Sequence, residues 1–127
     1  MLRGRTRLLR DAPTLPHIGW NQVEPTRTHP FLAGISPGAD FYFVHSYAGE
    51  PDGPDATEVV IATTTHGRPF VSAVAWGHVL GVQFHPERSG ADGLRLLGNA
   101  VDLARGGRWP SPERPAAASN PVAAAAR

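Results

Sequence analysis

A histidine and a glutamate stand two residues apart in the segment GVQFHPERSG, which covers residues 81–90. His85 ends an apolar run, Pro86 follows it, and Glu87 completes the pair. Along an extended backbone, residues i and i+2 point to the same side and lie about 6.5 Å apart. A carboxylate at that spacing fixes the tautomer of the imidazole and leaves its second ring nitrogen free to act as a general base. The segment therefore predicts a base and its orienting carboxylate at the end of a strand.

A general base of this kind usually serves a nucleophile, most naturally a cysteine. The chain has no cysteine, which excludes disulfides, thiolate metal sites and a thiolate nucleophile. On its own, His-Pro-Glu is also typical of a solvated surface turn, because exposed histidine and glutamate side chains are common. The pair needs support from the rest of the sequence.

The composition is that of a single domain. The chain has 127 residues, of which 41% are apolar and 18% charged, and no stretch approaches the roughly 20 consecutive apolar residues of a spanning helix. Twelve arginines nearly balance eleven acidic residues, so the net charge of +1 gives no reason to expect nucleic-acid binding. The arginine-rich residues 1–11 lack the apolar segment of a secretory signal and are interpreted as a short strand or loop. Six histidines without an i, i+4 pair do not indicate a metal site.

Runs rich in β-branched and aromatic residues, joined mainly by short turns, predict four strands with largely antiparallel pairing. A proline-marked stretch and a turn-rich connector precede them, and residues 48–57 are expected to form a polar loop. Because Pro86 cannot donate to a sheet ladder, the last strand is expected to end near Phe84. The predicted strands are 41–47, 58–65, 69–76 and 79–84.

A helix is predicted over residues 93–105, with a pair at Ser89 and Asp92 that resembles a cap and a stop at Gly106-Gly107. Residues 108–127 have no apolar period and repeated prolines, which is typical of a disordered tail. The apolar residues of the helix recur at i, i+3, i+7 and i+10 and predict one buried stripe: Leu94, Leu97, Val101 and Ala104.

Four segments occur in an order and spacing that match a known family: PHIGWNQV (16–23), FYFVHSY (41–47), EVVIATTTHG (58–67) and GVQFHPERSGADGLRLLGNAV (81–101). Over roughly residues 10–105, the chain resembles the C-terminal half of a class I glutamine amidotransferase. Within that superfamily it is similar to the amidotransferase subunits of imidazole glycerol phosphate synthase, because GQFHPE-like runs mark the superfamily broadly, whereas the GWN and FYFVHSY segments point to the histidine-pathway members. The implied fold is α/β, with mostly antiparallel strands, one C-terminal helix and the central parallel strands missing.

The resemblance assigns roles to single residues. The family uses a Cys-His-Glu triad, in which His85 matches the general base and Glu87 its orienting partner. The strip after the aromatic strand binds the glutamine head group, partly through backbone atoms, and corresponds to residues 45–47, that is His45, Ser46 and Tyr47. Four further residues match positions near the interface with a cyclase subunit: Trp20, Asn21, Tyr42 and Arg88, the last of which is usually lysine in the family.

Some of these residues also have a purely structural interpretation. Trp20 could be a core residue, Tyr42 could serve packing alone, and His17 and His45 could be hydrogen-bonded structural histidines. His66, in a Thr-His-Gly-Arg turn, is expected to be exposed and without a role.

The departure from the family is large. Its nucleophile elbow, G-x-C-x-G-x-Q, and its glycine-rich oxyanion strand belong to the N-terminal half and have no counterpart here, so the chain alone is expected not to hydrolyse glutamine. We therefore expect a partial amidotransferase domain over 1–107 and a Pro/Ala-rich tail over 108–127, arising from a truncated gene, a gene-model fragment or one half of a split enzyme. The resemblance implies a cytoplasmic heterodimer with the cyclase subunit, glutamine as substrate, and no cofactor, metal, nucleic acid or membrane. Two alternatives stay open: a non-catalytic interaction module that keeps the cyclase-facing surface, and a fragment of another class I amidotransferase such as the pyridoxal-phosphate synthase glutaminase.

Overall fold

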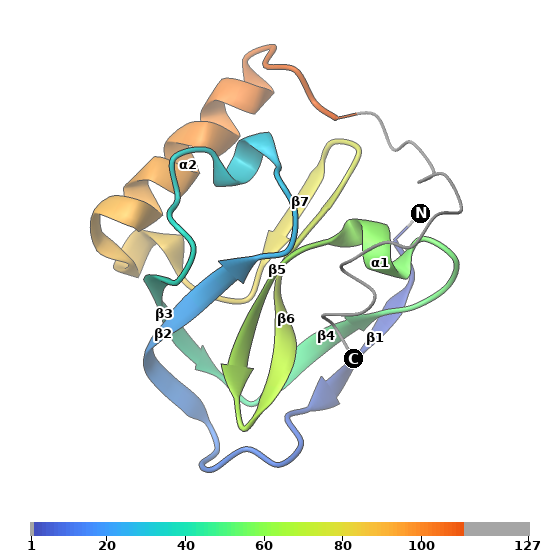
Figure 1. Cartoon of the computed structure of the whole chain (residues 1–127), viewed down its shortest axis with the longest axis vertical. Helices are drawn as coiled ribbons and strands as arrows, with labels where there is room; N and C mark the ends of the chain where they lie inside the picture. The colour runs from blue at the N-terminus through green and yellow to red at the C-terminus, as the bar shows by residue number, and fades with distance from the viewer. Residues whose placement is uncertain (1, 111–127) are drawn as a thin grey trace.

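Two antiparallel sheets and one long helix form the part of the chain described by the computed structural model, residues 2–110 (Figure 1). The larger sheet has the strand order β3-β2-β5-β6-β7, and the smaller one pairs β1 with β4. Every strand pairing within this range is antiparallel, as the short connections predict. The elements are β1 Gly4–Leu8, β2 His17–Pro25, η1 Pro30–Leu32, β3 Ala39–His45, β4 Tyr47–Pro51, α1 Ala56–Val59, β5 Val60–His66, β6 Arg68–Trp76, β7 Val79–Val82, η2 Pro86–Arg88 and α2 Gly90–Ala104, where η marks a 3-10 helix.

The four predicted strands are confirmed as β3, β5, β6 and β7, within two residues at each end. In β3 the alternation of the sequence decides the two faces, because Phe41 and Phe43 are fully buried while Val44 points outward. The first residues of the predicted strand 58–65 instead end the short helix α1.

Two strands, β2 and β4, lie where no strand was predicted. The stretch that becomes β2 contains Gly19 at a φ of +123°, a value that L-residues rarely adopt, and it has no clear alternation of side chains. It is held by its neighbour, because it pairs with β3 from His17↔His45 to Val23↔Ala39. The Gly- and Pro-containing β4 likewise pairs with β1, whose short strand was one of the two expected forms of the N-terminus. Tertiary pairing outweighs weak local propensity in both strands.

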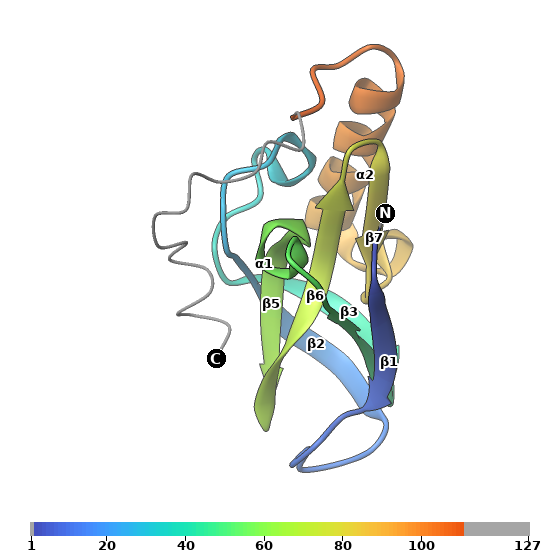
Figure 2. The same cartoon turned by 90° about the vertical axis from the view of Figure 1, so that its right-hand side faces the viewer.

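The long helix α2 lies along the larger sheet near β3 (Figures 1 and 2), and it buries a different face from the predicted one. Leu96 and Leu103 are almost completely buried in the core. The predicted buried stripe is wrong, because its members are exposed: Leu94 by 70%, Leu97 by 41%, Val101 by 48%, and Ala104 as well.

Contacts with neighbouring segments decide which face of α2 is buried. Gly93 lies so close to η2 that a Cβ atom there would overlap the carbonyl oxygen of Pro86. Asn99 Nδ2 donates to the carbonyl oxygens of Phe31 and Ala33, at 2.9 and 2.8 Å. Neither glycine nor asparagine counts as apolar in a search for hydrophobic periodicity. The periodicity of the sequence therefore predicted a buried stripe on the other face of the helix.

The helix stops where glycine was predicted to stop it, since α2 ends at Ala104 and Gly106 adopts a φ of +104°. The packed domain continues past the predicted boundary at residue 107. Trp109 Nε1 donates to the carbonyl oxygen of Leu103 at 2.9 Å, and its ring lies 4.9 Å from that of His78. The rest of the predicted tail, from residue 111, lies outside the described residues. No helix between residues 2 and 110 has the length and apolar content needed to span a bilayer.

Candidate active site

The end of β7 places His85 against the middle of β3. The Phe84 side chain is buried and packs on Phe41, with ring centroids 4.4 Å apart. One residue further, the amide of His85 donates to the carbonyl oxygen of Tyr42 at 2.9 Å. An aromatic anchor and a backbone hydrogen bond therefore fix the backbone of His85, while its imidazole stays partly exposed.

The structure brings His85 and Glu87 into direct contact. The Nδ1 atom of His85 lies 2.8 Å from Oε1 of Glu87, and within residues 2–110 the Nε2 atom has no hydrogen-bond partner. The pairing arises from the 3-10 turn η2 rather than from an extended strand, because Pro86 starts a helical turn that folds Glu87 back. The hydrogen bond from His85 lowers the pKa of Glu87 below its ordinary value, so the carboxylate stays ionised at neutral pH. This arrangement can accept a proton at Nε2 and stabilise the resulting imidazolium.

Ser89 holds the backbone of His85 in place, a role that was not predicted from the sequence. Its expected capping role is not realised, because its side chain makes no cap hydrogen bond to α2. Instead, the buried Ser89 Oγ donates to the carbonyl oxygen of His85 at 2.6 Å and accepts from the amide of Tyr42 at 3.0 Å. Ser89 thus links the turn of residues 85–88 to β3.

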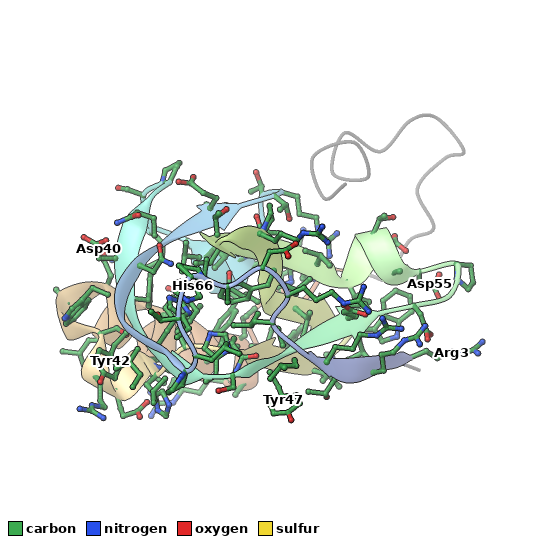
Figure 3. All side chains as sticks on the ribbon, turned by 90° about the horizontal axis from the view of Figure 1, so that it is seen from below. Arg3, Asp40, Tyr42, Tyr47, Asp55 and His66 are labelled. Atoms are coloured by element: carbon green, nitrogen blue, oxygen red, sulfur yellow. The ribbon has the colours of Figure 1, made fainter. Side chains whose placement is uncertain are left out.

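The strip 45–47 lies at the point where β3 passes into β4. The Nδ1 atom of His45 donates to the carbonyl oxygen of Tyr47 at 2.9 Å, and the carbonyl oxygen of Ser46 accepts from the amide of Leu9 at 2.9 Å. The strip follows Tyr42 on the same strand, so its start lies about 10 Å along β3 from Tyr42, at 3.3 Å per residue. Figure 3 labels Tyr42 and Tyr47, which mark the two ends of this stretch.

Two histidines that are far apart in the sequence, His17 and His66, lie close to His45 of this strip. The buried His17 lies with Nδ1 2.8 Å from Nε2 of His45, and its ring stacks on that of His66 at 4.1 Å. Burial, followed by the charges of His66 and His45, lowers the pKa of His17 to about 4. The expectation that His66 is exposed is wrong, because it is half-buried, and its Nε2 donates to the carbonyl oxygen of Thr14. Within the described range, no group of three or more possible ligands is arranged to hold a metal ion.

Three of the four predicted interface residues form one exposed cluster. Trp20 is 58% exposed, which argues against the interpretation as a core residue, and its ring meets that of Tyr42 edge to face at 6.1 Å. The guanidinium carbon of Arg88 lies 4.4 Å from the centre of the Tyr42 ring, a cation–π contact. Asn21 points to the opposite face of β2, where Nδ2 donates to the carbonyl oxygen of Thr65 at 2.8 Å. We call Trp20, Tyr42 and Arg88 the aromatic cluster.

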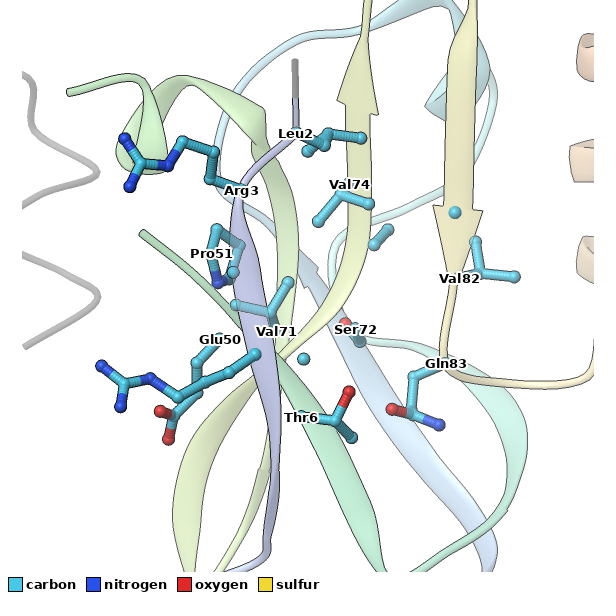
Figure 4. A pocket seen from close by; sticks show the side chains of 15 residues that line it. Leu2, Arg3, Thr6, Glu50, Pro51, Val71, Ser72, Val74, Val82 and Gln83 are labelled. Carbon is cyan, nitrogen blue, oxygen red and sulfur yellow. The ribbon is translucent and has the colours of Figure 1, made fainter. Parts of the chain in front are cut away.

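Two hollows of the described chain lie away from His85 and Glu87. One, of about 350 Å³, lies between the smaller sheet and the strands β6 and β7 (Figure 4). The other, of about 430 Å³, is lined by β1, β4 and the start of β6. His85 and Glu87 line neither hollow.

Comparison with known proteins assigns the family. The family model of glutamine amidotransferase class-I matches residues 5–102, and the chain belongs to this family. Similar curated proteins are named imidazole glycerol phosphate synthase subunit HisH. The protein of Photorhabdus laumondii is 52% identical over 89 residues, which cover 70% of this chain and 42% of that protein. The protein of Vibrio cholerae is 47% identical over 105 residues, 81% of this chain and 49% of that protein. The chain thus spans less than half the length of these relatives.

Proposed function

We propose that this chain is part of the amidotransferase subunit of an imidazole glycerol phosphate synthase, which hydrolyses glutamine and supplies ammonia to a cyclase subunit in histidine biosynthesis. The observation that carries the proposal is the catalytic pair: Glu87 occupies Nδ1 of His85 at 2.8 Å, and Nε2 remains free for a nucleophile. The similarity to HisH subunits supports the assignment within the amidotransferase family.

The mechanism needs a cysteine that another polypeptide segment supplies. The thiol gives its proton to Nε2 of His85, and its sulfur attacks the carboxamide carbon of glutamine. His85 then returns the proton to the leaving nitrogen, so ammonia departs and a γ-glutamyl thioester remains. Water, deprotonated by the same imidazole, hydrolyses the thioester to glutamate and restores the thiol. Glu87 stabilises the imidazolium in both halves of the reaction.

The glutamine head group would bind at the strip 45–47. This strip follows Tyr42, the β3 residue that bonds the amide of His85, and Tyr47 is 55% exposed. Because the carbonyl oxygens of Ser46 and Tyr47 are already occupied by Leu9 and His45, the backbone of the strip is held in one conformation before substrate arrives. Such preorganisation lowers the entropic cost of binding.

Two surfaces support the amino-terminal half of an amidotransferase domain as the missing segment. On α2, the stripe of Leu94, Leu97 and Val101 is exposed although it is apolar. In the described sheet, β7 is the terminal strand and pairs only with β6. The groove beside β7 contains Ser72, whose buried Oγ has no hydrogen-bond partner within the described residues (Figure 4). Free strand edges, apolar stripes and unpartnered buried hydroxyls are features that folded proteins normally cover.

The aromatic cluster is the proposed contact with the cyclase. The cluster combines an exposed tryptophan and an exposed arginine with a partly buried tyrosine between them, and tryptophan, tyrosine and arginine are the residues enriched in interaction hot spots. The aromatic cluster is also joined to the turn of residues 85–88, because Arg88 follows Glu87 directly and the carbonyl oxygen of Tyr42 accepts from the amide of His85. Asn21 does not belong to this surface in the described chain.

Co-expression tests the proposal. The chain is produced with the amino-terminal half of the Photorhabdus laumondii HisH subunit and with the cyclase subunit of that enzyme, and glutamate release from glutamine is measured. We expect turnover only in the complete mixture, with a loss of at least about 100-fold in the His85→Ala variant. The chain alone is expected to be inactive. A complete mixture that binds together but does not exceed the His85→Ala background would refute the proposed function.

The non-catalytic interaction module remains the second candidate, because the aromatic cluster is complete without any added segment. It predicts that the chain binds the cyclase by itself, with a loss of affinity of about tenfold or more in the Trp20→Ala variant, and that the added amino-terminal half produces no turnover. Turnover that depends on His85 would exclude it.

A further inference from the structure

A chain of four hydrogen bonds links the strip 45–47 to β5 through the core side of β2. From the strip, the Tyr47 carbonyl oxygen accepts from Nδ1 of His45 at 2.9 Å. The Nε2 atom of His45 lies 2.8 Å from Nδ1 of His17, whose Nε2 lies 3.1 Å from Nδ2 of Asn21. Asn21 Nδ2 donates its second proton to the Thr65 carbonyl oxygen at 2.8 Å. We call these four bonds the relay.

The relay allows only one placement of protons. A carbonyl oxygen can only accept, so His45 donates from Nδ1 and, as a neutral imidazole, accepts at Nε2. His17 must then donate from Nδ1 and accept at Nε2, and the amide nitrogen of Asn21 supplies that proton. Asn21 cannot rotate its amide by 180° without losses, because its Oδ1 accepts from the amide of Gln22 at 2.8 Å. Asn21 therefore sets the tautomers of both histidines.

The surroundings keep both rings neutral. His17 is 4% exposed and stacks on the rings of Phe43 and His66, at 4.9 and 4.1 Å. The pKa of His17 is lowered to about 4, mainly by burial, and burial also lowers the pKa of His45. At neutral pH, each ring therefore has one donor and one acceptor nitrogen, as the relay requires.

We infer that His17 and Asn21 are positioning residues for the strip 45–47: they fix His45 as the Nδ1–H tautomer, and that proton holds the Tyr47 carbonyl at the passage from β3 to β4. The inference rests on the proposed function in taking glutamine as the ligand of the strip. It also moves Asn21 from the cyclase surface to the glutamine side of the molecule.

Imidazole ¹⁵N spectra of the full chain, labelled at histidine and recorded by magic-angle spinning on sedimented protein, test the relay even if the chain self-associates. We expect neutral Nδ1–H tautomers for His17 and His45 at pH 7. In the isosteric Asn21→Asp variant a carboxylate can only accept, so Nε2 of His17 must become protonated. The control Gln22→Ala lies next to Asn21 on β2, removes only an exposed side-chain hydrogen bond to Asp40 of β3, and should leave both spectra unchanged. An Nε2–H tautomer of His45 in the unaltered chain, or an unprotonated Nε2 of His17 in Asn21→Asp, overturns the relay.

The positioning role is tested in the complemented enzyme. For Asn21→Asp and His17→Gln we expect KM for glutamine to rise about tenfold with kcat within about twofold, since binding is lost equally in ground and transition state. Gln22→Ala should keep both constants, and cyclase affinity should stay unchanged in all three variants. Unchanged KM in the two relay variants overturns the positioning role even if the relay exists. If the unaltered mixture shows no turnover, the proposed function fails. Amide hydrogen exchange then tests the positioning role: faster exchange of residues 45–47 in Asn21→Asp than in Gln22→Ala supports it, and equal exchange overturns it.

Discussion

The hydroxyl of Ser89 lies 2.6 Å from the carbonyl oxygen of His85, to which it donates, and it accepts from the amide of Tyr42 at 3.0 Å. One buried side chain therefore ties the residue that can act as a base to the strand that leads into residues 45–47. Ser89 directly precedes α2, and because its side chain makes no cap hydrogen bond to the helix, the hydroxyl is free to bond the preceding turn.

Removing this hydroxyl should loosen the base. We expect Ser89→Ala to lower the free energy of unfolding by about 1–3 kcal/mol, because the amide of Tyr42 loses its partner and the carbonyl oxygen of His85 keeps only the amide of Arg88. Urea denaturation measures the change. Ser36→Ala, at an exposed serine in the loop before β3, is the control and should stay within about 0.5 kcal/mol. Equal stability of the two variants would contradict the bridging role.

Glu87→Gln should impair catalysis more than structure. The amide can no longer stabilise an imidazolium and can present its own N–H to Nδ1, so the tautomer of His85 changes. In the complemented enzyme we expect kcat for glutamine hydrolysis to fall roughly 10²- to 10⁴-fold. Because the pKa of Glu87 is already lowered by the hydrogen bond from His85, its carboxylate contributes above pH 4.5 and is lost only in more acidic solution. Glu50→Gln, at an exposed glutamate paired with Arg7, is the control, and a similar loss there would count against the assignment.

His29 should make the stability of the chain depend on pH. It is 5% exposed, and its Nδ1 accepts from the amide of Phe31 at 3.0 Å, which caps η1. Burial, then the charge of Arg27, lowers its pKa from 6.5 to about 4. Between these values the unfolded chain binds a proton that the folded chain does not. Stability is therefore fully present above pH 6.5 and falls as the pH approaches 4, by up to about 1.4 kcal/mol per pH unit.

Urea denaturation between pH 4 and 7 checks this dependence. His29→Asn keeps a capping acceptor but does not titrate, so the slope should become smaller, although His17 continues to contribute in the same direction because its pKa is also about 4. His78→Asn changes an exposed histidine and should leave the slope unchanged. An unaltered slope in His29→Asn would exclude His29 as its source.

The sequence was sufficient for the elements that depend on local pattern, and insufficient for those that depend on partners. The aromatic and β-branched content of residues 41–47 predicted β3, and the His-Pro-Glu spacing predicted a contact that is seen at 2.8 Å. The strand β2 and the approach of His17 to His45 could not be predicted, because both follow from a strand pairing between residues 28 positions apart. A signal was present in the recurrence of histidine on the two segments, but only the pairing register places them opposite each other.

The outer stripe of α2 gives the most direct test of what covers this chain. Leu94 and Leu97 are exposed, whereas the neighbouring Leu96 is fully buried. Changing Leu94 and Leu97 together to Gln should leave the free energy of unfolding of the isolated chain within about 1 kcal/mol, because the two side chains already face solvent. The same variant should lose binding to the amino-terminal half, since polar amides would then lie in an apolar contact.

Leu96→Ala is the matched control, and it should destabilise the chain by about 2–5 kcal/mol through loss of core packing. Analytical ultracentrifugation of the chain alone and pull-down of the tagged amino-terminal half separate the possible partners of the stripe. If the double variant abolishes self-association but still binds the amino-terminal half as tightly as the unaltered chain, the stripe is an interface between two copies. If it loses the amino-terminal half and complemented turnover falls in parallel, the stripe is the surface on which the two halves of the domain join.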